Sequence, residues 1–446
     1  MRTCGYWLSA CLLVACATQA GERPTATISE PEQLQRVLLD GNVSEVSATT
    51  GAPEYSRALI RAVQLRTIGD IHGSDMAARR CMQLTVGDPE AFVAAGAICQ
   101  ELLTGNHFIS GDLAGWAKEA LELEALVAKV MTPAVKAQRA AFDLTGGVML
   151  TNLQGIDFRS IIKVRPMGLR LPNGPVLLVR IVPRTRGGGN LGYGPGSAPA
   201  PFAVDAAIDG LPAAALIDTG SVQSIVSEQV AARLHLRTIA QPYLAVSAGT
   251  GASTPSRLAI LDRVEVGQIT LTGVPVAVAG DEVPLVLGMD VLSRLGSVRF
   301  SDTQVIVHPD QFDCVQPLRQ GSQWLGNRWP LIEAELSGRR VSLMLDTGDE
   351  NVLVAAARSG LDAAKGEPTT LSLNDIGGHH AVDARRLEVT LEGQQASMLL
   401  IPQLEANYAY RLGAGVLRKF DVDLDLGRMV GCLQPRHVDW LMRPLR

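Results

Sequence analysis

The sequence predicts a multidomain α + β protein in which an N-terminal α-helical domain is followed by two tandem all-β lobes with pseudo-two-fold symmetry. Three observations lead to this prediction. Apolar residues recur at helical spacing over much of residues 29–145, whereas later segments alternate apolar and polar residues as strands do. The tripeptide Asp-Thr-Gly occurs at 218–220 and again at 346–348, each time after an apolar run. An internal repeat of this kind indicates one folding unit that is present twice.

The composition is that of an ordinary globular protein. The chain has 446 residues, of which 47% are hydrophobic and 19% are charged, and this length gives room for two or three domains. Its formal net charge is −5, and it contains no long run of Lys or Arg. Because binding to nucleic-acid phosphates requires a concentrated basic surface, we expect no nucleic-acid partner.

Residues 1–15 have the pattern of a signal peptide. A positive start at Arg2 is followed by an apolar run from Tyr6 to Ala15, which is too short to cross a bilayer as a permanent helix. The next residue is Cys16, and the sequence Leu-Val-Ala-Cys resembles the lipobox of bacterial lipoproteins. This resemblance implies cleavage before the cysteine and acylation of its thiol and its new amino group.

The lipobox resemblance implies a lipid anchor on the periplasmic side of the cell envelope, because several acyl chains together hold a protein stably on a membrane. Ala17 rather than Asp follows Cys16, which resembles the rule for outer-membrane rather than inner-membrane lipoproteins. Residues 16–28 would then be a tether to the first folded element. The alternative is a plain secretory signal with an incidental cysteine.

Four cysteines remain once the signal peptide and Cys16 are set aside. Four cysteines permit three pairings, and an exported protein meets oxidising conditions. The domain layout favours Cys81 with Cys99 in the helical domain and Cys314 with Cys432 around the second lobe. The alternative is four reduced cysteines in the core. Neither pair has the spacing of a metal site, and we expect no metal and no cofactor.

Residues 29–145 are expected to form the α-helical domain. Ser29 and Glu32 match a capping box at its start. This domain either packs on the lobes or spaces them from the membrane, and its Ala-rich helices weakly resemble tetratricopeptide-like helix pairs. The alternative is a module that binds a peptide or protein partner. Further helices are expected at 54–68, 75–84, 89–104 and 112–131.

Residues 146–200 change in character to strands and a glycine-rich connecting loop. Apolar runs at 161–164 and 176–181 predict two strands, which lie on either side of the turn signal Pro-Asn-Gly at 172–174. These strands either form a sheet that joins the lobes or begin the first lobe. The glycine-rich stretch at 186–200 is followed by a strand rather than a helix, so we expect a surface loop instead of a phosphate site.

The repeat extends beyond the tripeptides. The strand pattern at 202–210 recurs at 331–338, and an apolar-apolar-Gly motif at 286–292 recurs at 411–417. The order and the spacing of these features agree in the two copies. The two lobes are therefore expected at 201–312 and 313–446.

Asp218 and Asp346 each end a short apolar strand pattern. Burying a single ionised carboxyl costs several kcal/mol unless the group is paired or shares a proton. Two such strand ends in one chain therefore predict that the two acids face each other.

Over about residues 200–435 the chain resembles the retropepsin-like aspartic proteases. Their pattern is an apolar pair, Asp-Thr/Ser-Gly, a flap, and then apolar-apolar-Gly-x-x-x-Leu, and both copies lie in one chain here, as in pepsin-like enzymes. The resemblance implies an aspartic endopeptidase with Asp218 and Asp346 as its catalytic dyad. The two carboxyls would share one proton, a behaviour typical of aspartic protease dyads, and would activate a water molecule that attacks the peptide bond.

The same resemblance assigns roles to the rest of each tripeptide. Thr219 and Thr347 would hold the two strand ends together with reciprocal hydrogen bonds. Gly220 and Gly348 would let the two backbones approach closely, since they carry no Cβ atom.

The resemblance also places a flap between each aspartate and the later glycine motif. Gly249 and Gly251 mark a hairpin tip in the first lobe, and Gly377 and Gly378 mark one in the second. Hairpins at these positions could close over an extended peptide and bind it by backbone hydrogen bonds.

Two features depart from the family pattern. Asp349 and Glu350 follow the second tripeptide, and their negative charge should raise the pKa of the carboxyl pair unless they are solvated or paired. Gly415 stands where the first lobe has Asp290, which is a candidate helix cap.

The competing hypothesis is a catalytically silent, peptide-binding envelope lipoprotein that keeps the cleft but does not cleave. A third option is that the Asp-Thr-Gly turns arose by chance in unrelated β domains. Both tripeptides are intact and their flanks repeat in order, so the sequence favours the enzyme. The expected partners are a peptide or protein substrate and, through the N-terminal lipid, the membrane.

Overall fold

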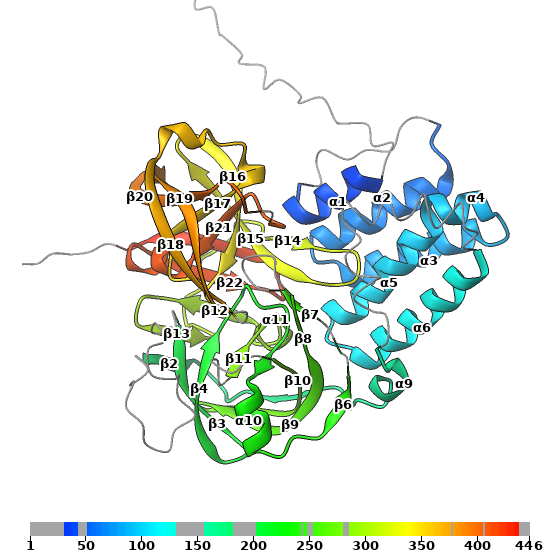
Figure 1. The fold of residues 1–446 in the computed structure, drawn as a ribbon, viewed down its shortest axis with the longest axis horizontal. Helices are drawn as coiled ribbons and strands as arrows, with labels where there is room; N and C mark the ends of the chain where they lie inside the picture. Colours follow the sequence, from blue (N-terminus) through cyan, green and yellow to red (C-terminus); the bar gives the residue numbers. More distant parts are fainter. Residues whose placement is uncertain are drawn as a thin grey trace, which may run out of the picture.

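The computed structural model (Figure 1) describes residues 31–42, 51–130, 156–181, 202–241, 243, 245–247, 253–279, 285–375, 378–404 and 406–436. A group of helices packs beside a larger strand-rich, barrel-like part. The predictions for the signal peptide, for Cys16 and its tether, and for the glycine-rich loop lie outside the described residues.

The helical part follows the predicted order, with boundaries that local caps explain. The Asp70 side chain accepts a hydrogen bond from the Gly73 amide (2.8 Å), so α3 begins at Ile71 rather than at the expected residue 75. None of the helices in the described ranges is long and apolar enough to cross a membrane. The helices are α1 Pro31–Asp40, α2 Glu54–Thr67, α3 Ile71–Thr85, α4 Pro89–Ala91, the π-helical turn η2 Phe92–Gly96, α5 Ala97–Ile109 and α6 Leu113–Val130.

The strands form two large sheets and a two-stranded ribbon, β7 Ala245–Ser247 with β8 Ser253–Pro255. The larger sheet runs in the order β23-β22-β12-β13-β2-β3-β4-β11-β5-β10-β9-β6, with β1 beside β10. Its strands are β1 Gly168–Arg170, β2 Val176–Ile181, β3 Ala203–Ile208, β4 Leu211–Ile217, β5 Ile225–Val226, β6 Thr238–Ala240, β9 Arg257–Val266, β10 Ile269–Val278, β11 Leu285–Leu287, β12 Ser297–Phe300, β13 Gln304–Val307, β22 Phe420–Asp425 and β23 Val430–Pro435.

The smaller sheet runs in the order β14-β15-β16-β21-β17-β20-β19-β18. We call residues 202–292 the Asp218 unit and residues 319–418 the Asp346 unit. The strands of the smaller sheet are β14 Arg319–Ser322, β15 Arg328–Leu336, β16 Arg339–Asp346, β17 Leu353–Ala356, β18 Glu367–Asp375, β19 Gly378–Leu391, β20 Gln394–Ile401 and β21 Tyr410–Gly413.

A group of strands from three parts of the chain joins the two units. The late strand β22 pairs antiparallel with β12, and β13 pairs antiparallel with β2. The predicted strand at 176–181 is confirmed as β2, which pairs with β13 and also with β3, the first strand of the Asp218 unit. Residues from both units contribute to one continuous buried core, which includes Phe202 of the Asp218 unit and Leu343 of the Asp346 unit.

The strand expected at 161–164 was wrong. Residues Phe158–Ile161 form a short helix, α9, because the Asp157 side chain accepts a hydrogen bond from the Ser160 amide (3.2 Å) and caps its first turn. Of the expected run only Ile161 lies in this helix, where it is buried with Phe158 against the helical part, and residues 162–164 form a turn and irregular structure. A short apolar run does not distinguish these two outcomes by periodicity alone.

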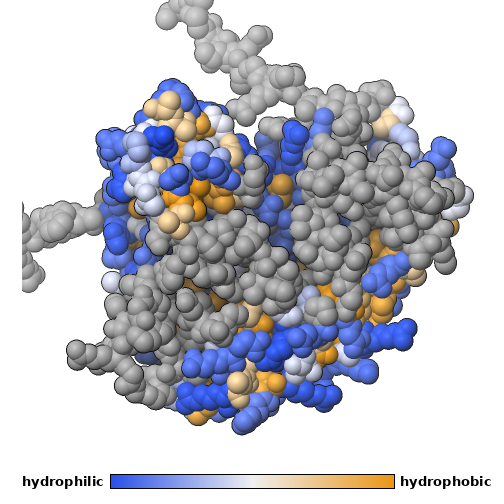
Figure 2. All heavy atoms as spheres, viewed as in Figure 1, coloured by the Kyte–Doolittle hydropathy of each residue, from blue (hydrophilic) through white to orange (hydrophobic). Residues whose placement is uncertain are grey.

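The helical part covers one face of the larger sheet. Trp116 of α6 meets Phe158 at 5.3 Å and Tyr243 at 6.2 Å between ring centroids, both edge to face. These rings pack with Leu216 and Val286 of the Asp218 unit in one buried cluster. The lower edge of the strand-rich part in Figure 1, near β3, β9 and α10 (Glu228–Arg233), carries mainly hydrophilic side chains in Figure 2.

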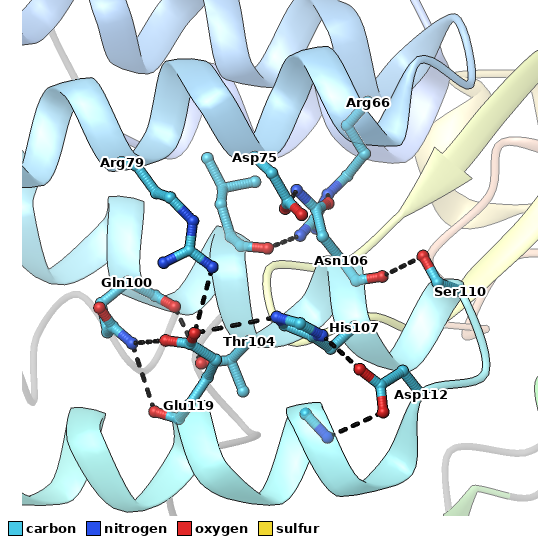
Figure 3. A network of polar contacts seen from close by, with 12 residues as sticks. Arg66, Asp75, Arg79, Gln100, Thr104, Asn106, His107, Ser110, Asp112 and Glu119 are labelled. Atoms are coloured by element: carbon cyan, nitrogen blue, oxygen red, sulfur yellow. Dashed lines mark hydrogen bonds and ion pairs between the residues drawn. The ribbon is translucent and has the colours of Figure 1, made fainter. Parts of the chain in front are cut away.

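The helical part also holds the loop between β14 and β15. The buried Arg66 guanidinium donates to the carbonyl oxygens of Gln323 (2.8 Å) and Trp324 (2.9 Å) and to Asn106 Oδ1 (2.7 Å). Figure 3 shows Arg66, Asn106 and Asp75 converging from three helices. Burial lowers the pKa of Arg66 to about 9, and the carbonyl acceptors compensate for the lost hydration. The helices therefore contact both units rather than the first alone.

Candidate active site

Each aspartate of the repeat stands at the end of a central strand that pairs in parallel with a later one. Asp218 follows β4, which pairs with β11, and its amide donates to the Leu287 carbonyl (3.0 Å). Asp346 is the last residue of β16, which pairs with β21, and it lies opposite Gly413. The glycine motif that sequence analysis linked to each tripeptide is thus its neighbour in the sheet.

The two threonines link the tripeptides through four hydrogen bonds. The amide of Thr219 donates to Thr347 Oγ1 and the amide of Thr347 donates to Thr219 Oγ1, both at 3.0 Å. Thr219 Oγ1 donates to the Leu345 carbonyl (2.9 Å) and Thr347 Oγ1 to the Ile217 carbonyl (2.7 Å). Both threonines are fully buried, so leaving any of these groups unpaired would cost about 1 to 3 kcal/mol.

The two glycines make room for the opposite carboxyl group. A Cβ atom on Gly220 would lie 2.4 Å from Asp346 Oδ1, and one on Gly348 would lie 2.6 Å from Asp218 Oδ1. Neither distance is tolerated by real side chains. The Gly220 amide also donates to Asp218 Oδ1 (2.8 Å), and the Gly348 amide donates to Asp346 Oδ1 (3.0 Å). Each tripeptide therefore orients its own carboxylate and admits the other.

Asp218 and Asp346 are buried within hydrogen-bonding reach of each other. Burial raises the pKa of Asp218, while the hydrogen bond from the Gly220 amide opposes that rise. Burial and then the charge of Asp218 raise the pKa of Asp346 well above its ordinary value. Two close carboxyls in such a place hold one proton between them, because ionising both would set like charges together.

The negative charge that follows the second tripeptide has a partner that the sequence analysis did not identify. Arg411 Nη2 lies 2.5 Å from Asp349 Oδ2, and Arg411 Nη1 lies 3.4 Å from Asp346 Oδ2. All three side chains are at least 87% buried, whereas Glu350 is exposed. The negative charge of Asp349 is therefore paired with a cation. The signal in the sequence was an arginine inside an otherwise apolar motif.

Asp290 is a buried acid outside the dyad. It does not cap α11 (Met289–Leu292), whose N-cap is Gly288; its Oδ1 instead accepts a hydrogen bond from Ser224 Oγ (2.8 Å). Burial raises its pKa to about 6. In the Asp346 unit a Cβ on Gly415 would lie 2.4 Å from the Glu350 carbonyl oxygen, so no side chain fits there.

Hairpins are present where the flaps were expected. The ribbon of β7 and β8 is antiparallel, as is the longer pair of β18 and β19. Gly378 begins β19 and pairs with Asp375. Gly249, Gly251 and Gly377 lie outside the described residues, so their assignment to flap tips stays a prediction.

Both expected cysteine pairings are confirmed. Cys81 and Cys99 join α3 to α5 with an S–S distance of 2.03 Å, and Cys314 is bonded to Cys432 of β23. The alternative of four reduced cysteines is wrong. The second bridge closes a segment of 118 residues that contains the whole Asp346 unit, and such long loops restrict the unfolded chain most. In the described ranges, His, Cys, Asp and Glu side chains do not gather in threes as a metal site would require.

Comparison with known proteins found a family match in the region of the first tripeptide. A model of the aspartyl protease family matches residues 204–291, which span the first tripeptide and its glycine motif. No curated protein matches the chain significantly. The solved structures that match include a retropepsin-like aspartic protease from Rickettsia conorii, at 17% identity over 32% of this chain and 93% of that chain, with a TM-score of 0.22. Residues 204–291, which carry the first tripeptide, are therefore similar to the aspartyl protease family.

Proposed function

We propose that the protein is an aspartic endopeptidase that hydrolyses peptide bonds of protein or peptide substrates. The observation that carries this proposal is the reciprocal arrangement of the two tripeptides, in which each buried carboxyl sits in the space left by the other's glycine. The four threonine hydrogen bonds support two lobes related by a pseudo-two-fold axis, with the dyad between them.

The two carboxyls divide the chemistry. Burial raises the pKa of both carboxyls, and the pair holds one proton between them, so one acts as the base and the other as the acid. The ionised carboxyl takes a proton from water as the oxygen bonds to the scissile carbonyl carbon, and the other carboxyl donates the shared proton to the carbonyl oxygen. The resulting diol collapses when the carboxyl that took the water proton passes it to the amide nitrogen and the C–N bond breaks, while the other carboxyl recovers a proton from a diol hydroxyl. No covalent enzyme intermediate forms.

The flap hairpins would bind the substrate on either side of the dyad. An extended peptide can add to the edge of a hairpin as a further strand, which supplies backbone hydrogen bonds with little dependence on sequence. The proposal assigns this role to the ribbon of β7 and β8 and to the hairpin of β18 and β19.

The test uses the mature chain without its lipid, from residue 17 onward, with a peptide library over the acidic to neutral pH range. Asp218→Asn and Asp346→Asn are compared with the wild type, because each removes one carboxyl and keeps the shape of the side chain. We expect cleavage by the wild type alone. Equal cleavage by all three proteins would refute the dyad, and peptide binding without any cleavage would favour the silent binder.

We also propose that the protein is held on the periplasmic side of the outer membrane by a lipid on Cys16. The support is the lipobox resemblance in the sequence. Metabolic labelling with a radioactive fatty acid should mark the wild type but not Cys16→Ser. Label in both variants, or in neither, would contradict the anchor while leaving the proposed protease activity untouched.

A further inference from the structure

Arg411 is a buried cation beside the Asp346 carboxyl of the dyad. It lies on β21, opposite Met344 of β16 and Val354 of β17, so its backbone is held on both sides. Its side chain is 9% exposed. A cation in such a position loses most of its hydration, and it is tolerated only where anions or acceptors surround it.

The groups that face Arg411 explain how its charge is balanced. Asp349 lies 2.5 Å from Nη2, Asp346 lies 3.4 Å from Nη1, and the guanidinium carbon stands 5.2 Å above the Tyr408 ring. Asp218 is the next charge that the cation senses. The contacts with Asp346, Asp349 and the Tyr408 ring hold the guanidinium in one orientation, in which Nη1 faces the dyad and Nη2 faces Asp349.

The Asp218 unit has no equivalent cation. The matching position in its glycine motif is Val286, which lies in the apolar cluster under the helices with Leu216 and Trp116. The two tripeptides of the dyad are similar, but their surroundings differ. A buried cation lies beside Asp346, whereas the matching position in the Asp218 unit lies in an apolar cluster.

We propose that Arg411 is a positioning residue for the proposed protease reaction: it holds the Asp346 carboxyl in place from behind and stabilises the singly charged state of the dyad, while Asp349 fixes the guanidinium. This inference rests on the proposed function. Because the cation favours ionised carboxyls, it keeps one of the two acids ionised at lower pH than an apolar neighbour would.

Substitution of Arg411 and substitution of Asp349 should shift the pH dependence of the reaction in opposite directions. Arg411→Met removes the cation, so both limbs of the pH–rate profile should move to higher pH, by about 1 to 3 units for an opposite charge at this range. Asp349→Asn removes an anion whose charge raises the pKa of Asp346, so the limbs should move to lower pH. Arg411→Lys keeps the charge, and its limbs should lie between those of the wild type and Arg411→Met.

A matched control separates this role from simple stabilisation. Arg328 is a partly buried arginine whose charge is stabilised by Asp290 rather than by the dyad. Arg328→Met should therefore lower the melting temperature without moving either limb. Loss of activity in Arg411→Met and Asp349→Asn with both limbs unmoved would overturn the proposal, because it would show that the pair only supports the fold.

A second measurement keeps the test valid if the proposed function is wrong. Carboxyl-carbon NMR can follow the ionisation of Asp218 and Asp346 in the folded protein without any substrate. Absence of peptide cleavage by the wild type would refute the protease, whereas the NMR titration would still decide whether Arg411 sets the charge of the pair. Should Arg411→Met fail to fold, Arg411→Lys and Asp349→Asn carry the same comparison. Titration curves equal to those of the wild type in these variants would overturn the proposal.

Discussion

The Asp218 and Asp346 units hold their carboxyls with the same backbone geometry, but different side chains pack beside the two carboxyls. In both units a buried threonine, a glycine without room for a Cβ, and a parallel neighbouring strand fix the carboxyl. Behind Asp218 the sheet is apolar and packs on helices, whereas behind Asp346 stands Arg411. The two tripeptides therefore share one backbone geometry, whereas the side chains packed beside them differ between the two units.

The comparison is sharpest at the dyad, where we expect the largest effect. Asp218→Asn and Asp346→Asn should each lower peptide turnover by about a thousandfold, because each removes one half of a general acid–base pair. Turnover of the purified variants on one cleaved peptide measures this. A much smaller loss for one variant would break the equivalence of the two units.

The same two substitutions should raise stability at neutral pH. A carboxyl whose pKa is raised on folding binds more protons when folded, so its contribution to the free energy of unfolding falls as pH rises from its unfolded pKa to its folded pKa. Asparagine removes this loss at either position. Urea unfolding at acidic and neutral pH provides the measurement, and a gain that is equal at both pH values would contradict the explanation.

The threonine bridge offers a symmetrical test. Thr219→Val and Thr347→Val each remove a hydroxyl that donates one hydrogen bond and accepts another, so each should lower the free energy of unfolding by about 2 to 4 kcal/mol. Thr219→Ser and Thr347→Ser keep the hydroxyl and serve as controls. Unequal losses at the two positions would show that one unit depends on the bridge more than the other.

The contact of α6 with the Asp218 unit predicts a difference in local stability between the two units. Trp116→Ala should destabilise the protein by about 3 kcal/mol or more, because it removes a buried ring that contacts both Phe158 and Tyr243. Trp116→Phe is the conservative control. If hydrogen exchange rises across the Asp346 unit but not the Asp218 unit, the assignment of this contact to the Asp218 unit fails.

The smallest expected effect is at Asp290, which has no counterpart beside Gly415. Its pKa of about 6 lies above the unfolded value of 3.8, so its contribution to stability falls between about pH 4 and pH 6. Asp290→Asn keeps an oxygen for Ser224 and should raise stability at neutral pH by at most about 3 kcal/mol. A variant that matches the wild type at both pH 4 and pH 7 would contradict this.

Much of the site could be predicted from the sequence because it is built from local, repeated signals. The Asp-Thr-Gly turns, their apolar strands and the later glycine motif specify backbone geometry over a few residues. Helix starts were also well marked by caps, although α3 begins at Ile71 because Asp70 acts as its cap. The strand expected at 161–164 was wrong because Asp157 caps a short helix that ends at Ile161, and Phe158 of that helix packs on Trp116.

By itself the sequence determined which residues form the two carboxyl-bearing turns, which cysteines share a region of the chain, and where the helices give way to strands. Only the tertiary structure decided what stands behind each turn: the helices on the Asp218 unit, the Arg66 contacts with the 323–324 carbonyls, and Arg411 between Asp346 and Asp349. The physical reason is the distance along the chain over which each interaction acts. Turns and strand periods depend on neighbouring residues, whereas the compensation of a buried charge depends on groups that come together only when the chain is folded.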